Sequence, residues 1–193
     1  MSNIAIFASG SGTNAEEIIR YFSTKNNAKV TLILSNKREA YVLKRADNHN
    51  IPSVFFDQKD FYQNTTVLDT LSDYKIDLIV LAGFLWLVPE NILSAYNKRI
   101  INIHPALLPS YGGKGMYGEK VHKSVIENRE KESGITIHYV NQYYDSGDII
   151  FQAHCKVERD DTPETLASKI HALEYEHYPR VVDEVVSSLP QIS

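Results

Sequence analysis

Five short apolar runs, separated by stretches with helical spacing, limit the fold more than any other feature of this sequence. The runs are continuous rather than alternating, which is typical of strands buried on both faces of a parallel sheet. Parallel strands need long crossover connections, and the intervening stretches are long enough to be helices. The expected strands cover residues 4–8, 30–34, 52–56, 77–82 and 100–103, and the expected helices cover 14–25, 39–50 and 59–74.

The second half of the chain has a different pattern. A helix is expected at residues 119–128, and residues 135–140 then alternate apolar and polar, as a half-buried strand does. A turn of Asn, Asp, Ser and Gly residues leads from there to another expected strand at 148–157. Because two strands joined this closely pair most easily as a hairpin, we expect them to be antiparallel.

The last helix has a clear start. Thr162 is a good N-cap, Pro163 takes the first helical position, and the helix is expected to run to residue 187 with a kink at Pro179. We therefore predict an α/β fold with a single Rossmann-like domain over residues 1–193. Its sheet is expected to be mostly parallel, with an antiparallel C-terminal strand and helices on both faces.

The composition narrows the classes of function. Hydrophobic residues make up 43% of the chain and charged residues 23%, a balance typical of a globular protein. The net charge is −4 and no basic cluster occurs, so nucleic acid is not an expected partner. The N-terminal apolar run is too short for a signal peptide or a membrane span. We expect a cytoplasmic protein that acts on small molecules, has no membrane partner and is a monomer or homodimer.

Cysteine chemistry is limited to one residue. Cys155 is the only cysteine, which excludes an internal disulfide and a Cys-x-x-Cys zinc motif. It is expected to be a buried residue of a strand.

A glycine-rich turn follows the first expected strand directly and opens the first helix. Backbone N–H groups at such a position attract phosphate, and glycine lets the anion approach closely. A dinucleotide site also requires an acidic residue at the end of the second strand, but that strand runs into the neutral and basic residues 35–37. We therefore predict a site for a single phosphomonoester; the alternative is a tight turn that binds nothing. The predicted ligands are Gly10, Ser11, Gly12, Thr13 and Asn14.

Asn102 and His104 stand two residues apart where the fifth strand runs into a Pro-rich loop. Side chains at i and i+2 of a strand point to the same face, at the sheet edge where open α/β sheets bind ligands. Asn donates a neutral hydrogen bond, and His exchanges a proton near neutral pH. Asp145 is expected nearby, where its carboxylate would raise the pKa of His104 and keep it charged. Such a trio suits acyl transfer through a tetrahedral oxyanion, without a covalent enzyme intermediate or a metal.

Other interpretations of these residues stay open. Asn102 could be a plain turn residue, His104 a core histidine, and Asp145 a turn former. Asp148 is the rival carboxylate in the same segment.

Further polar residues lie near the trio in the predicted fold. Thr136 and His138 alternate on the strand at 135–140. They are expected to contact the trio and hold it in position without touching the substrate. The histidines on expected helices are predicted to be surface residues, although His171 stands one turn from Glu174 on the same face and could touch a ligand. The three helical histidines are His122, His171 and His177.

Taken together, these motifs resemble the phosphoribosylglycinamide formyltransferases, a family of folate-dependent enzymes. The Asn-x-His…Asp set is shared by the wider formyltransferase superfamily, and the glycine turn ending in Thr-Asn points to the members that act on glycinamide ribonucleotide. The resemblance covers nearly the whole chain. Its landmarks are residues 10–14, 34–36, 81–84, 102–109, 136–138 and 145–147.

The resemblance implies formyl transfer from 10-formyltetrahydrofolate, as co-substrate, to the amine of glycinamide ribonucleotide in purine biosynthesis. It places the substrate phosphate on the glycine turn, in the N-terminal half, and a carboxylate from Glu174 on the ribonucleotide. Folate binding and catalysis belong to the C-terminal half, and no metal takes part. The residues expected along the folate are Lys59, Leu85, Trp86, Leu87, Val88 and Asn102.

The sequence departs from its relatives at several points. Trp86 and Lys59 stand where Arg is found in other members, and Lys is a point charge without the planar fork of Arg. The loop 111–118 also differs from the shorter Pro-Gly form. By the same resemblance, the Leu108–Pro109 bond is predicted to be cis.

Three rival functions share part of these motifs. One is formyl transfer to methionyl-tRNA or a nucleotide sugar, and another is formyltetrahydrofolate hydrolysis. The tRNA enzymes are expected to carry a further C-terminal domain, and the hydrolases an N-terminal extension. The third rival is a non-catalytic nucleotide-binding module that keeps only the glycine turn.

Overall fold

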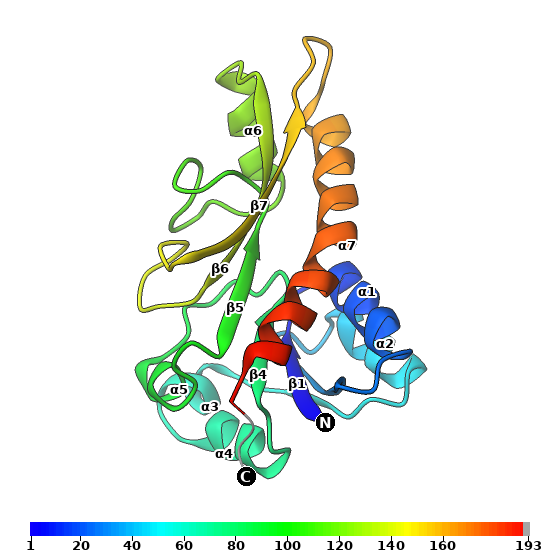
Figure 1. Ribbon diagram of the computed structural model, residues 1–193. Coiled ribbons are helices and arrows are strands. Elements are labelled where there is room, and N and C mark those ends of the chain that lie inside the picture. The colour runs from blue at the N-terminus through cyan, green and yellow to red at the C-terminus, as the bar shows by residue number, and fades with distance from the viewer. Residues whose placement is uncertain (191–193) are drawn as a thin grey trace.

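A seven-stranded sheet runs through the computed structural model, which describes residues 1–190 (Figure 1). The strand order is β3-β2-β1-β4-β5-β6-β7. The first five strands pair in parallel, whereas β6 runs antiparallel to both β5 and β7. The strands are β1 (Ser2–Phe7), β2 (Ala28–Ser35), β3 (Ser53–Phe55), β4 (Leu78–Leu81), β5 (Ile100–His104), β6 (Glu132–Tyr139) and β7 (Ile149–Lys156).

The helices cover both faces of this sheet, as the sequence predicts. The longest, α7, runs beside β4 and β6 along much of the molecule, from the end that carries α6 to the end near both termini (Figure 1). The helices are α1 (Thr13–Phe22), α2 (Tyr41–Asn48), α3 (Gln58–Tyr62), α4 (Thr66–Asp73), α5 (Glu90–Ala95), α6 (Glu119–Glu127) and α7 (Pro163–Ser188). None of the helices within residues 1–190 combines the length and apolarity needed to cross a membrane.

Two details of the helix prediction are wrong. The single helix expected over 59–74 is two helices, because Asp57 caps α3 through a capping box and the Asn64 side chain accepts from the Thr66 N–H group at the start of α4. Such local side-chain bonds end one helix and begin another. Helix α5 was not predicted, since its six residues are too few to show a helical period.

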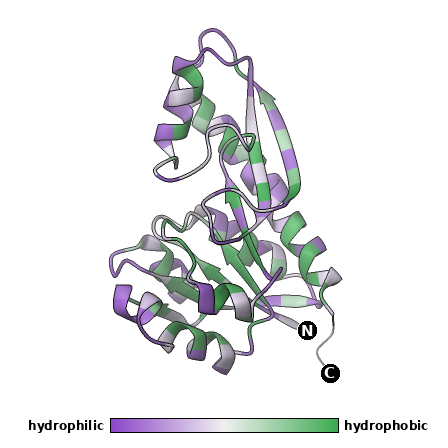
Figure 2. Cartoon of the chain, turned by 90° about the vertical axis from the view of Figure 1, so that its left-hand side faces the viewer, coloured by the Kyte–Doolittle hydropathy of each residue, from purple (hydrophilic) through white to green (hydrophobic). Residues whose placement is uncertain are grey.

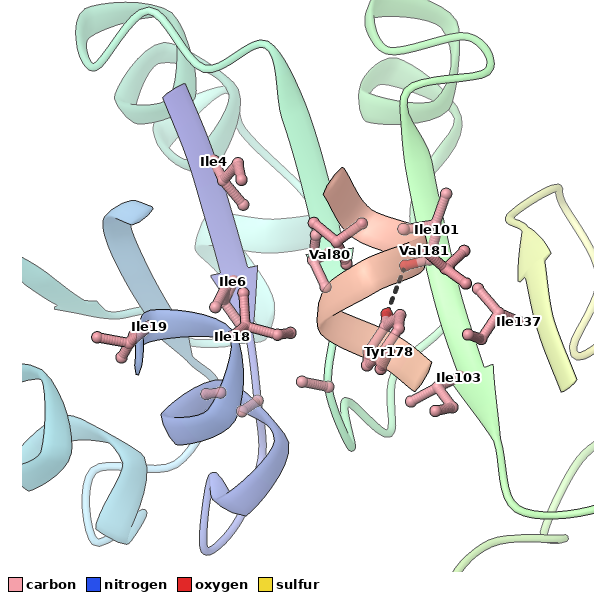
Figure 3. Packing of buried hydrophobic residues seen from close by; sticks show 14 of the residues in the cluster. Ile4, Ile6, Ile18, Ile19, Val80, Ile101, Ile103, Ile137, Tyr178 and Val181 are labelled. Carbon is pink, nitrogen blue, oxygen red and sulfur yellow. Dashed lines mark hydrogen bonds between the residues drawn. The ribbon is translucent and has the colours of Figure 1, made fainter. Parts of the chain in front are cut away.

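Alternate residues of each central strand pack into two separate hydrophobic cores, one on each face of the sheet. Ile4 and Ile6 of β1 face α1 and α7, whereas Ala5 and Phe7 face the opposite side. Figure 3 shows the first core, where Tyr178 of α7 lies among isoleucines of the sheet, and its dashed line marks the bond from the Tyr178 phenol to the Ile101 carbonyl at 3.4 Å. The same phenol lies closer, at 2.8 Å, to the Leu81 carbonyl. Burial of each such aliphatic side chain contributes about 1.5–3 kcal/mol. The hydropathy colours of Figure 2 show the same arrangement, with apolar strands inside and polar residues on the outer helix surfaces.

Cys155 is only partly buried, which corrects the expectation of a buried strand residue. It lies on β7, which is an edge strand and therefore has a neighbour on one side only.

Candidate active site

A cavity of about 360 Å³ opens at the carboxyl ends of β1, β4 and β5. Strand β1 lies between β2 and β4, so the strand order changes direction at β1. Open α/β sheets bind ligands at such a topological switch point. The glycine turn, the end of β5, the loop after it and α7 all contribute to its wall. Among the lining residues are Gly10–Asn14, Asn102, His104, Asp145, His171 and Glu174.

The predicted trio comes together in this cavity. Asn102 and His104 share one face of β5, and the Asp145 carboxylate lies with Oδ2 3.5 Å from His104 Nδ1 and Oδ1 3.5 Å from Asn102 Nδ2. The Gly113 N–H group donates to Asp145 Oδ2 at 3.0 Å and holds that carboxylate in place. Asp148 is exposed, and its backbone carbonyl accepts from the Tyr139 N–H group. Asp145 rather than Asp148 is therefore the carboxylate of this site.

The hydrogen bonds of His104 determine where its proton can move. Nε2 lies 2.8 Å from the Tyr111 carbonyl, which can only accept, so Nε2 carries a hydrogen. The nitrogen that gains or loses a proton is therefore Nδ1, which faces Asp145.

The pKa of His104 corrects one expectation. Burial lowers this pKa, and the attraction of Asp145 and the bond to Tyr111 oppose the shift without overcoming it. Asp145 thus acts in the expected direction, but the His104 side chain is only 4% exposed and burial disfavours its charged form. His104 is therefore held below its ordinary pKa rather than kept charged. The Asp145 carboxyl itself has a lowered pKa, because bonds and charges from His138, His104 and Gly113 outweigh its burial, which alone would raise it.

His138 orients the Asn102 amide. Its Nδ1 lies 2.8 Å from the Tyr139 carbonyl and so donates there. Without a hydrogen, Nε2 accepts from Asn102 Nδ2 at 3.1 Å, and with a hydrogen it faces Asp145 Oδ1 at 3.7 Å. The second N–H bond of Asn102 has only the long contact to Asp145, so it can donate to a ligand oxygen. His138 pairs with Asn102 across β5 and β6.

Thr136 supports the loop rather than the trio directly. Its hydroxyl donates to the Ala106 carbonyl at 2.7 Å and accepts from the Leu108 N–H group and the Gln152 amide, both at 2.9 Å. These bonds hold residues 106–108 beside His104. The Leu108–Pro109 bond in this loop is cis, as predicted.

The predicted phosphate turn meets the last helix in the same cavity. Asn14 Nδ2 donates to Glu174 Oε2 at 3.0 Å, while Asn14 Oδ1 is buried without a partner in the described part of the chain. Burial raises the pKa of Glu174 to about 7, and the Asn14 bond only partly offsets this. His171 is exposed and lines the cavity.

The segment expected along the folate touches the cavity only at one residue. Leu85 lines the wall, whereas Val88 is buried in the core and Trp86 packs against the rings of Phe56 and Phe61. Lys59 is exposed on α3 and is not among the cavity residues.

Two residues of the site were not identified from the sequence. The Tyr111 carbonyl, which fixes Nε2 of His104, depends on a left-handed backbone at φ 57° that no residue type signals. His122 was expected on the surface but is 3% exposed, and burial lowers its pKa to about 4. The apolar stripe of Val121 and Val125 on α6 could have indicated that His122 faces inward.

No group of three or more His, Cys, Asp or Glu side chains suited to hold a metal ion occurs within residues 1–190.

Comparison with known proteins identifies the class of enzyme to which this chain is related. The sequence matches the formyl transferase family over residues 2–182, and the chain belongs to this family. Among its relatives is the chloroplastic phosphoribosylglycinamide formyltransferase of Arabidopsis thaliana, which is 40% identical over 94% of this chain and 64% of its own length. The phosphoribosylglycinamide formyltransferase of Bacillus subtilis is 36% identical over 96% of this chain and 95% of its own length. The chain thus spans less than two thirds of the plant relatives but nearly all of the bacterial one.

Solved structures of phosphoribosylglycinamide formyltransferases share the fold. The crystal structure from Bacillus halodurans has a TM-score of 0.88 and 37% identity, and covers 99% of this chain and 98% of that one. The structure from Anaplasma phagocytophilum has a TM-score of 0.89 and 34% identity, and covers 97% and 87%. The predicted fold class and the family resemblance are confirmed.

Proposed function

We propose that this chain transfers a formyl group from 10-formyltetrahydrofolate to the primary amine of glycinamide ribonucleotide, a step of de novo purine biosynthesis. The relatives support this reaction, since they are named phosphoribosylglycinamide formyltransferases. The observation that carries the proposal is that one cavity holds both the glycine turn and the trio of Asn102, His104 and Asp145. A phosphate-bearing substrate bound on the turn reaches toward an oxyanion donor and a proton carrier.

The reaction forms a C–N bond between the substrate amine and the formyl carbon and breaks the bond from that carbon to N10 of the folate. Asn102 donates its free N–H to the oxygen on which negative charge develops; one such donor is typically worth about 2.7–4 kcal/mol at the transition state. Because His104 starts mainly neutral at pH 7, its Nδ1 can take the proton released by the attacking amine. The imidazolium is then paired with Asp145 and passes the proton to the departing nitrogen, directly or through a water. The proton count is therefore balanced without a metal.

The two substrates are assigned to different sets of residues. The phosphate binds on Gly10, Ser11, Gly12, Thr13 and Asn14, and Glu174 and His171 contact the rest of the ribonucleotide. The folate lies along residues 85–88 and meets the cavity at Leu85, the one of these residues that lines it. The N–H groups of Trp86, Leu87 and Val88 have no protein acceptor in residues 1–190, which leaves them for a pterin ring. Lys59 supplies a point charge for the folate carboxylates.

We also propose a cytoplasmic location, a monomeric or homodimeric state and a single domain over residues 1–193. The single domain is supported by α7, which packs against α1 from the first half and against α6 and β6 from the second. Two plant relatives are described as chloroplastic, so fractionation of the source cells is the test of location. Analytical ultracentrifugation tests the oligomeric state.

The test is an assay of formyl transfer from the 5,8-dideaza analogue of the donor to glycinamide ribonucleotide. We expect activity in the wild type and a fall of roughly a hundred- to ten-thousand-fold in His104→Ala. Asp145→Asn should also lose most activity. Matched controls are His154→Ala and Asp148→Asn, which change exposed side chains away from the trio and should keep full activity.

Each rival predicts a different result in this assay. Release of formate without transfer supports the hydrolase. Binding of the ribonucleotide with neither reaction supports the non-catalytic module. Transfer to methionyl-tRNA or a nucleotide sugar, but not to glycinamide ribonucleotide, supports the remaining rival.

A further inference from the structure

The glycine turn is held from behind by α2. The Val42 N–H group donates to the Gly10 carbonyl at 3.2 Å, and Arg45 Nε donates to the Ser11 carbonyl at 2.8 Å. Two consecutive carbonyl groups of the turn therefore point toward α2. Helix and turn are also in close contact, since a Cβ atom on Gly12 would lie 2.5 Å from Val42 Cγ2.

The direction of these carbonyls sets the direction of the N–H groups. In a trans peptide unit the C=O and N–H bonds point to opposite sides. Fixing the Gly10 and Ser11 carbonyls on α2 therefore turns the N–H groups of Ser11 and Gly12 away from it, on the side where these residues line the cavity. Neither N–H group has a protein acceptor within residues 1–190, which leaves both for an anion.

Arg45 is itself fixed by an ion-pair cluster. Its Nη1 lies 3.1 Å from Glu16 Oε2, and Glu16 Oε1 lies 3.1 Å from Arg20 Nε and 2.8 Å from His49 Nε2. Glu16 belongs to the first turn of α1 and its side chain is only 12% exposed. The planar guanidinium thus joins the glycine turn to α1 with two N–H donors, a geometry that Lys cannot reproduce.

We infer that Arg45 is a positioning residue of the phosphate site, which directs the Gly12 N–H group into the cavity by holding the Ser11 carbonyl. The inference rests on the proposed function, because that function assigns the phosphate to this turn. A charged donor on the carbonyl also polarises the peptide unit and strengthens its N–H group as a donor. Arg45 acts through the backbone of the turn and contacts neither the substrate amine nor the formyl carbon.

The test compares Arg45→Met with the wild type on substrates with and without the phosphate. For glycinamide ribonucleotide, Arg45→Met should raise KM about tenfold, the size expected for losing a charge-assisted hydrogen bond, with kcat and the folate KM within about twofold. For the dephosphorylated glycinamide ribonucleoside, kcat/KM should be unchanged. Arg45→Lys should recover only part of the loss. Arg20→Met is the matched control, since it removes another cation from Glu16 without touching the turn, and it should leave both substrates unaffected.

Direct binding separates this inference from the proposed function. Ribose 5-phosphate should bind the wild type and Arg20→Met equally in calorimetry and bind Arg45→Met about tenfold more weakly. An equal loss on both substrates, or no loss on either, overturns the role of Arg45 while leaving the phosphate site intact. If the wild type binds neither ribose 5-phosphate nor the ribonucleotide, the proposed site fails and this inference fails with it. Should Arg45→Met not fold, the same comparison with Arg45→Lys decides, because a loss confined to phosphorylated ligands is still required.

Discussion

Asn14 Nδ2 donates a hydrogen bond to Glu174 Oε2 at 3.0 Å. This contact joins the glycine turn at the start of α1 to the last helix, across 160 residues of sequence. Glu174 is 7% exposed and no cation within residues 1–190 lies against its carboxylate, so its environment favours the neutral acid. One hydrogen bond therefore links the predicted phosphate turn to a carboxyl group that titrates near neutral pH.

The first prediction concerns the pH dependence of stability in Glu174→Gln. The folded-state pKa is raised from 4.5 to about 7, so between these values the folded protein binds more protons than the unfolded chain. The wild type should lose stability as pH rises from about 4.5 to 7, and Glu174→Gln should not. A difference of about 2.5 pKa units corresponds to at most about 3 kcal/mol. The free energy of unfolding of Glu174→Gln should exceed that of the wild type by up to this amount at pH 8, and the two should differ little at pH 4. Urea unfolding at both pH values measures it. Glu176→Gln on the exposed side of α7 is the control, and parallel curves for Glu174→Gln and wild type would contradict the prediction.

The second prediction separates backbone strain from contact at Gly12. Gly12 and Gly83 have nearly the same left-handed φ, 71° and 72°, but a Cβ atom meets Val42 at Gly12 and open space at Gly83. Both alanine substitutions should cost roughly 1–2 kcal/mol for the backbone conformation. Gly12→Ala should cost a further 1–3 kcal/mol, approximately, because the turn must move away from α2. It should also weaken ribonucleotide binding. Chemical denaturation and calorimetry are the measurements, and equal destabilisation by the two substitutions would refute the contact.

The third prediction concerns Asp145→Asn. Asp145 raises the pKa of His104 against a larger lowering by burial, so its removal should lower that pKa further. The protonated fraction of His104 at pH 7 should fall, and its titration should move to more acidic pH. Nitrogen-15 NMR of the imidazole measures the titration directly. His104 titrating at the same or a higher pH in the variant would show that the carboxylate does not act on it.

The fourth prediction concerns Thr136→Val, which keeps the shape of the side chain and removes the hydroxyl. The Ala106 carbonyl, the Leu108 N–H group and the Gln152 amide lose a partner in a buried position. Destabilisation by about 1–3 kcal/mol is expected, together with a lower kcat from the loosened loop beside His104. Thr70→Val is the control, because its hydroxyl only bonds the Thr66 carbonyl on an exposed helix surface. The prediction fails if both variants are equally stable and active.

Features that depend on neighbouring residues could be predicted from the amino-acid sequence. Continuous apolar runs predicted the parallel strands, and the two-residue spacing of Asn102 and His104 placed both on one face of β5. Thr162 and Pro163 marked the start of α7. Each of these follows from strand period or helix capping, which act over a few residues.

Features that depend on distant parts of the chain follow only from the folded structure. The lowered pKa values of His122 and His104 depend on how many atoms pack around each imidazole, because burial outweighs a single nearby charge. The bonds from Asn14 to Glu174 and from Arg45 to the Ser11 carbonyl join residues 160 and 34 positions apart. No local pattern encodes such contacts, since they exist only once the sheet has brought the carboxyl ends of its strands, α2 and α7 around one cavity.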